Sequence, residues 1–127
     1  MKTISRVFVL LVLFSLSSQS MATTTSNAVK KAQEAVSESP YDWKILAESA
    51  VICFKKGENI DEAMKWINKS IEINKDPMNL EIKADYLVEQ GKKKEASKFY
   101  IEAINTAKNQ NFWYDTSDLQ QKLWKLR

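Results

Sequence analysis

Small residues and glycines recur in this chain at a spacing of 33 or 34 residues. The matched pairs are Ala50 and Ala84, Gly57 and Gly91, Ala63 and Ala96, and Ser70 and Ala103. The spacing changes by one residue because the first copy has an extra residue within 58–60. Self-similarity at a fixed period of roughly 20–50 residues is typical of architectures that stack one supersecondary unit. The chain is therefore expected to contain two copies of such a unit.

Each copy is predicted to be two helices joined by a turn. In the first copy, Leu46 and Cys53 lie about one helical turn on either side of Ala50, so the three residues share one face. A small residue in the middle of that face lets a second helix approach closely. Gly57 and Gly91 follow the first helix of each copy, where a left-handed residue ends many helices. The pattern therefore predicts helix hairpins.

Capping residues mark where further helices begin. Asn59 and Glu62 have the spacing of a capping pair for the second helix of the first copy. Asp76 followed by Pro77 predicts the next start, because proline suits the first helical position. A lone helix is expected before the copies and a closing helix after them, at about 116–126. The apolar side of the closing helix would comprise Leu119, Leu123, Trp124 and Leu126.

A helix, a glycine turn and a second helix at this period resemble the tetratricopeptide repeat (TPR) family. The resemblance implies an all-α domain at 23–127, built as a right-handed stack of helix hairpins. A lone helix would come first, then hairpins at about 42–75 and 76–109, then the closing helix. Residues 59–73 are also similar to the helical, TPR-like tail of an exported bacterial family of unknown function, in which a β-rich domain precedes the tail.

The first 22 residues have the composition of a secretory signal peptide. Lys2 and Arg6 precede an apolar run at 7–16, and Ser20 and Ala22 are small residues suited to a cleavage site. The run is much shorter than the roughly 20 apolar residues that cross a bilayer, so no stable membrane span is expected. Cleavage after Ala22 would export the domain to the periplasm or outside the cell.

Composition argues against most catalytic and nucleic-acid-binding classes. The chain has no histidine, one cysteine and two glycines, so a histidine base, a thiolate metal site and a phosphate-cradling loop are all missing. Without residues 1–22 there are 17 basic and 16 acidic residues, which is not the basic excess of a nucleic-acid binder. We therefore expect no enzyme, no metal, no cofactor and no nucleic-acid partner. Cys53 is expected in the core, with pairing between chains or a reactive thiol as alternatives.

The TPR resemblance implies a ligand groove on the concave side of the stack, lined by the first helix of each copy. The groove residues would be Lys44, Val51, Phe54, Lys55, Glu81, Asp85 and Glu89. One end would be apolar and basic, and the other acidic. The three acids are four residues apart and are expected to form a solvated face, with a cation site or an acid/base pair as alternatives.

Phe112, Trp113 and Tyr114 form an aromatic run between the last hairpin and the closing helix. We expect this run to pin the closing helix, because an exposed aromatic cluster of that size is unusual on a monomer. A partner-binding surface is the alternative.

These features predict a non-enzymatic, exported protein–protein interaction module of the TPR type, with a protein or peptide partner. The alternative is a structural subunit or detached helical tail that packs permanently on a partner or as a homo-oligomer. Two full repeats fall short of the roughly three that a stable stack usually needs, which favours that alternative.

The signal-peptide hypothesis predicts the amino terminus of the exported protein. Mass spectrometry of the protein recovered from its native host should show a chain that begins at Thr23. An intact Met1 on protein from the cytoplasm would contradict both the cleavage site and export.

Overall fold

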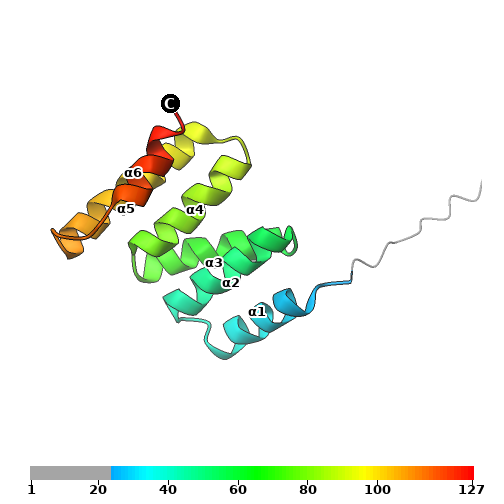
Figure 1. The fold of residues 1–127 in the computed structure, drawn as a ribbon. Coiled ribbons are helices and arrows are strands. Elements are labelled where there is room, and N and C mark those ends of the chain that lie inside the picture. Colours follow the sequence, from blue (N-terminus) through cyan, green and yellow to red (C-terminus); the bar gives the residue numbers. More distant parts are fainter. Residues whose placement is uncertain (1–23) are drawn as a thin grey trace, which may run out of the picture.

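The computed structural model describes residues 24–127, which form α-helices and contain no strand (Figure 1). The helices are α1 (Asn27–Glu38), α2 (Trp43–Lys56), α3 (Ile60–Ile73), α4 (Pro77–Glu89), α5 (Lys93–Gln110) and α6 (Ser117–Trp124). The all-α prediction is confirmed over this range. The expected signal peptide at 1–22 lies outside the described residues. Within them, no helix is both long and apolar enough to span a bilayer.

Helices that are neighbours in the sequence pack against each other. α2 packs on α3 and α4 packs on α5, while α1 covers α2 and α6 packs on α5. α4 also contacts both α2 and α3. In Figure 1 the chain runs from α1 in blue, through the green α2–α3 pair, to α4, α5 and the red α6. The two hairpins are thus joined through α4.

Alanines are buried in both hairpins. Ala50, Ala63, Ala84 and Ala96 are all fully buried. Two apolar clusters surround them, one in the first hairpin with Val29 of α1, and one in the second with Leu119 of α6. Cys53 belongs to the first cluster and is fully buried, and this burial raises the pKa of its thiol. The prediction of a core cysteine is confirmed.

Left-handed glycines end the first helix of each hairpin, as the spacing predicts. Gly57 has a φ of 66° and Gly91 a φ of 73°. The amide of Gly57 donates to the carbonyl of Phe54, and that of Glu58 donates to the carbonyl of Cys53. This pair of bonds is the Schellman arrangement, which satisfies the last carbonyls of α2. The same two bonds recur around Gly91 at the end of α4.

The two predicted helix starts have different outcomes. Asp76 caps α4 through a capping box with Asn79, and Pro77 opens the helix. At α3 the expected capping pair is wrong, because Asn59 is itself left-handed, with φ of 55°, and its side chain caps no amide. Glu62 instead pairs with Lys65 one turn along, at 2.7 Å. The extra residue of the first turn lies within 58–60, so the left-handed Asn59 stands where the capping pattern requires an extended residue.

A buried polar junction links the two hairpins. The hydroxyl of Ser70 in α3 donates to the carbonyl of Trp43 at the start of α2, at 2.6 Å. The same oxygen accepts from the amide Nδ2 of Asn79 in α4 at 2.9 Å, and this Nδ2 also donates to the carbonyl of Asn74. Ser70 and Asn79 are both fully buried. Buried polar groups are costly unless they are bonded, so this junction holds α2, α3 and α4 in one arrangement.

The closing helix is only partly as expected. Leu119 is buried in the second cluster, and Leu123 and Leu126 are half-buried against it. Trp124 was expected on the same side, but it is 67% exposed, with the guanidinium of Arg127 4.6 Å from its ring. The apolar stripe of α6 runs through Leu119 and Leu123, which are four residues apart. Trp124 is the next residue after Leu123 and the last of the helix, so its side chain points away from that stripe.

Replacing Ser70 with alanine tests the buried junction. Ser70→Ala keeps the small volume that Ala103 has in the second copy, but removes the bonds to Trp43 and Asn79. We expect the free energy of unfolding in urea to fall by about 1–2 kcal/mol. The control is Ser97→Ala, since the Ser97 hydroxyl bonds only the Lys93 carbonyl within its own helix, and its change should stay within about 0.5 kcal/mol. Equal effects in the two variants would contradict a linking role.

Candidate binding surfaces

The predicted groove is a narrow cleft between α2 and α4. It has a volume of about 80 Å³ and is lined by Val51, Phe54, Lys55, Ile82, Asp85, Tyr86 and Glu89. Five of the seven predicted groove residues therefore lie together. Lys44 is exposed on the first turn of α2 and Glu81 is half-buried on α4, and neither lines the cleft.

The floor of the cleft is closed by an aromatic stack. The ring of Phe54 lies 4.1 Å from that of Tyr86 between centroids, with an interplanar angle of 15°. Phe54 is only 8% exposed as a result. An incoming apolar side chain would have to displace Tyr86 to reach it. Phe54 therefore serves the contact between the hairpins, and the sequence pattern did not reveal Tyr86 because the contact crosses from one copy to the next.

The acidic end of the predicted groove is occupied by a cation from α6. Lys122 Nζ lies 2.7 Å from Glu81 Oε1 and 2.7 Å from Asp85 Oδ2. The hydroxyl of Tyr100 in α5 donates to the other oxygen of Asp85. The expectation of a solvated face is therefore wrong for Glu81 and Asp85, which attach α6 to α4. Glu89 is exposed and keeps the expected position.

Burial and bonding set the protonation of this cluster. Burial alone would lower the pKa of Lys122, but its bonds to Asp85 and Glu81 outweigh burial and raise it. Burial raises the pKa of Tyr100, and its bond to Asp85 raises it further. A lysine whose folded pKa is raised stabilises the fold fully below its unfolded pKa of about 10.4. That stabilisation is lost only as the pH rises through the raised value, so the α6 attachment persists at neutral pH.

The aromatic run is the most exposed apolar segment of the described chain. Phe112 is 72% exposed, Trp113 85% and Tyr114 42%. The expectation that the run pins α6 is therefore wrong, since Leu119 and Lys122 make that attachment. Phe112 and Trp113 meet edge to face, with centroids 5.2 Å apart. We call residues 111–116 the aromatic loop.

Polar contacts, not aromatic burial, hold the aromatic loop in place. Lys108 Nζ donates to the carbonyl of Tyr114 at 2.7 Å and to that of Phe112 at 3.3 Å. The amide of Trp113 donates to Asn111 Oδ1 at 3.0 Å. A surface hollow of about 490 Å³ lies against the loop and is lined by Lys108, Phe112, Trp113, Tyr114, Asp115, Thr116, Ser117 and Gln120. The rings are thus presented to solvent on an ordered backbone.

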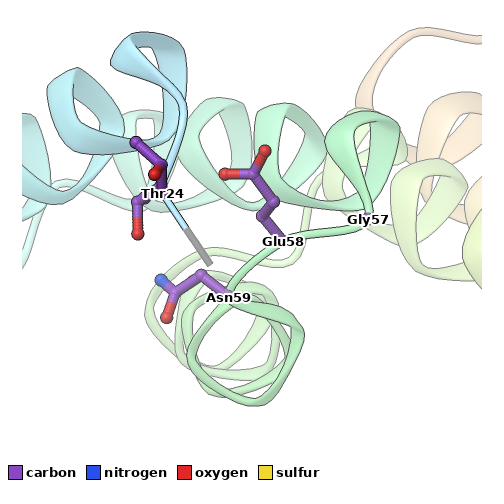
Figure 2. A pocket seen from close by; sticks show the side chains of 5 residues that line it. Thr24, Gly57, Glu58 and Asn59 are labelled. Atoms are coloured by element: carbon purple, nitrogen blue, oxygen red, sulfur yellow. The ribbon is translucent and has the colours of Figure 1, made fainter. Parts of the chain in front are cut away.

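A third hollow lies at the amino-terminal limit of the described residues. It has a volume of about 380 Å³ and is lined by Thr24, Thr25, Gly57, Glu58 and Asn59 (Figure 2). Glu58 accepts a hydrogen bond from the amide of Ser26 at 2.8 Å, which ties the segment before α1 to the turn after α2. Glu58 therefore serves a contact within the chain, whereas the amide Nδ2 of Asn59 is buried without a hydrogen-bond partner among the described residues.

The attachment of α6 can be tested by removing its cation. Lys122→Met leaves Glu81 and Asp85 without their counter-charge in a half-buried setting, so we expect a loss of about 1–2 kcal/mol in the free energy of unfolding. Amide hydrogen exchange should accelerate first in α6. The control is Lys65→Met, because the pair of Lys65 with Glu62 is on the open surface and its loss should leave the free energy of unfolding nearly unchanged. Unchanged exchange in α6 would contradict the attachment.

No site for metal chemistry is present among residues 24–127, where no three His, Cys, Asp or Glu side chains are grouped to hold an ion. The described surfaces instead offer a narrow interhelical cleft, an ion-paired closing helix and an exposed aromatic loop. No protein-family model, curated protein or solved structure matches this chain.

Proposed function

We propose that residues 23–127 form a non-enzymatic protein-interaction module of the TPR type, exported under the direction of residues 1–22. The α2–α3 and α4–α5 hairpins support the repeat assignment, because both turn at a left-handed glycine and both close on buried alanines. A right-handed stack, with α1 before the hairpins and α6 after them, is part of this proposal. The partner is a protein or peptide.

The observation that carries the binding role is the exposure of Phe112 and Trp113 on an ordered loop. Because these two rings are exposed to water, they add little hydrophobic stabilisation to the fold of the isolated chain. Aromatic side chains are enriched at the centres of protein interfaces, where a few of them supply most of the affinity. A fixed backbone also lowers the entropy cost of binding, because the loop is already ordered. The aromatic loop therefore has the exposure and the order of a protein-binding surface.

The aromatic loop is favoured over the groove between α2 and α4. A cleft of about 80 Å³ with a stacked aromatic floor has little room for a side chain. The hollow beside the aromatic loop is about 490 Å³ and opens on unpacked rings. The groove residues remain a second hypothesis for the binding surface.

A structural subunit or permanent homo-oligomer is the alternative function, and exposed aliphatic residues favour it. Ile73 and Ile101 are 43% and 47% exposed on α3 and α5. A permanent interface would bury such residues together with the aromatic loop. Sedimentation analysis of the mature protein separates the two functions, since a stable monomer supports the module and an obligate oligomer supports the subunit.

The interaction module predicts that partner capture depends on the aromatic loop. Phe112→Ser with Trp113→Ser should reduce capture of proteins from the exported fraction of the native host by about tenfold or more. Thermal unfolding should stay unchanged, because both rings are exposed. The control is Tyr41→Ser with Trp124→Ser, which removes two similarly exposed rings elsewhere and should retain capture. Equal capture by both double variants would contradict a role for the loop.

A further inference from the structure

Within residues 24–127, cations of the chain cover the two exposed aromatic rings outside the aromatic loop, Tyr41 and Trp124, and the half-buried ring of Phe99. The pairs are Lys69 over Tyr41 at 4.2 Å, Lys83 over Phe99 at 4.4 Å and Arg127 over Trp124 at 4.6 Å, each measured to the ring centroid. Tyr41 and Trp124 are 76% and 67% exposed, so a cation covers a ring that faces solvent. Such contacts stabilise because the ring face is negative.

The aromatic loop departs from this pattern. Within residues 24–127, no cation lies over the rings of Phe112, Trp113 or Tyr114. Lys108 is the cation beside the loop, but its ammonium group is directed to the carbonyls of Phe112 and Tyr114. Trp113, the best type of ring for a cation, is also the most exposed large apolar residue of the described chain.

A carboxylate stands beside these rings with one oxygen free. Asp115 Oδ1 accepts from the amide of Ser117 at 2.9 Å and from its hydroxyl at 2.7 Å. These bonds lower the pKa of Asp115, with a smaller contribution from Lys108, so the carboxylate is charged at neutral pH. Asp115 Oδ2 makes no bond to the other described residues, and Asp115 lines the same hollow as Trp113. The hollow thus combines an uncovered ring with an available anionic oxygen.

We propose that this hollow binds a guanidinium or ammonium group of the protein partner, stacked on Trp113 and paired with Asp115 Oδ2. The partner segment would carry an arginine or lysine next to an apolar side chain, which covers Phe112. This inference rests on the proposed function and specifies the partner's chemistry at that site. An arginine suits the site best, because its planar group stacks on a ring and bonds a carboxylate at once.

Charge favours a cationic protein segment over a lipid surface. Lys108 also lines the hollow, but its ammonium group is held by the carbonyls of Phe112 and Tyr114. Asp115 and Asp118 are exposed, and their carboxylates oppose an anionic membrane. A cationic segment is attracted by the Asp115 carboxylate, which lines the hollow, and this attraction would also speed its association.

The test uses the intact, ¹⁵N-labelled mature protein and a blocked peptide of sequence Gly-Leu-Arg-Leu-Gly. A second peptide carries citrulline, the neutral analogue of arginine, at the centre. We expect the arginine peptide to shift the indole N–H signal of Trp113 and the amide of Ser117, while the other three of the four tryptophan indoles stay in place. The citrulline peptide should bind about fivefold more weakly.

Two variants locate the cation. Asp115→Asn keeps an oxygen that can accept from Ser117, so the loop geometry is retained while the charge is lost. It should weaken the arginine peptide about fivefold and leave the citrulline peptide unchanged. Asp118→Asn is the control, since it removes an equal charge from the first turn of α6 outside the hollow. Equal binding of the two peptides, or no shift at Trp113 with either one, overturns the inference.

Other occupants of the loop give distinct outcomes. Insertion of Trp113 into vesicles of phosphatidylcholine and phosphatidylglycerol, with no response to the arginine peptide, would make the loop a lipid-binding element. A concentration-dependent dimer that buries Trp113 would make the occupant a second copy of the chain. Either result overturns the inference. A further outcome is that capture of the native partner is lost with Phe112→Ser and Trp113→Ser but kept with Asp115→Asn. That result overturns the proposed cationic group of the partner, while the proposed function stands.

Discussion

The hydrogen bonds around Ser70 and Asn79 decide how the two hairpins sit together. Each hairpin has its own apolar cluster and its own glycine turn, so each is organised by contacts close in sequence. The buried junction adds directional bonds among α2, α3 and α4, and a bonded polar group fixes orientation where apolar packing tolerates sliding. The Phe54–Tyr86 stack, which joins α2 to α4, depends on that orientation.

The helices and their turns could be predicted because they follow from local spacing. The helix ends at Gly57 and Gly91 could be predicted from the place where the apolar periodicity stops. The cap at Asp76 could be predicted from the proline that follows it. The cap at Asn59 failed because one inserted residue changes the turn geometry without changing the capping pattern. Local sequence thus predicts where a helix lies better than how its first turn is closed.

The candidate surfaces were harder to predict, because they depend on contacts between distant residues. Lys122 lies 37 residues from Asp85, and nothing in the pattern of α6 separates a lysine that reaches another helix from one in solvent. The groove was predicted from the spacing within each helix, so the contact of Tyr86 with Phe54 across α2 and α4 was missed, as was the pairing of Lys122 with Glu81. The aromatic loop was misjudged for a related reason, since Lys108 supplies by hydrogen bonding the order that ring burial was expected to supply.

The burial of Cys53 makes its alkylation rate a measure of how often the first hairpin opens. It is the chain's single cysteine, it lies in the apolar cluster of α2 and α3, and its thiol stays protonated because burial raises its pKa. A thiol-modifying reagent reacts with the exposed thiolate, so it can reach this sulfur only when the apolar cluster around it opens. The rate of alkylation of the native protein therefore measures how often the first hairpin opens, independently of motions at α6 and the aromatic loop.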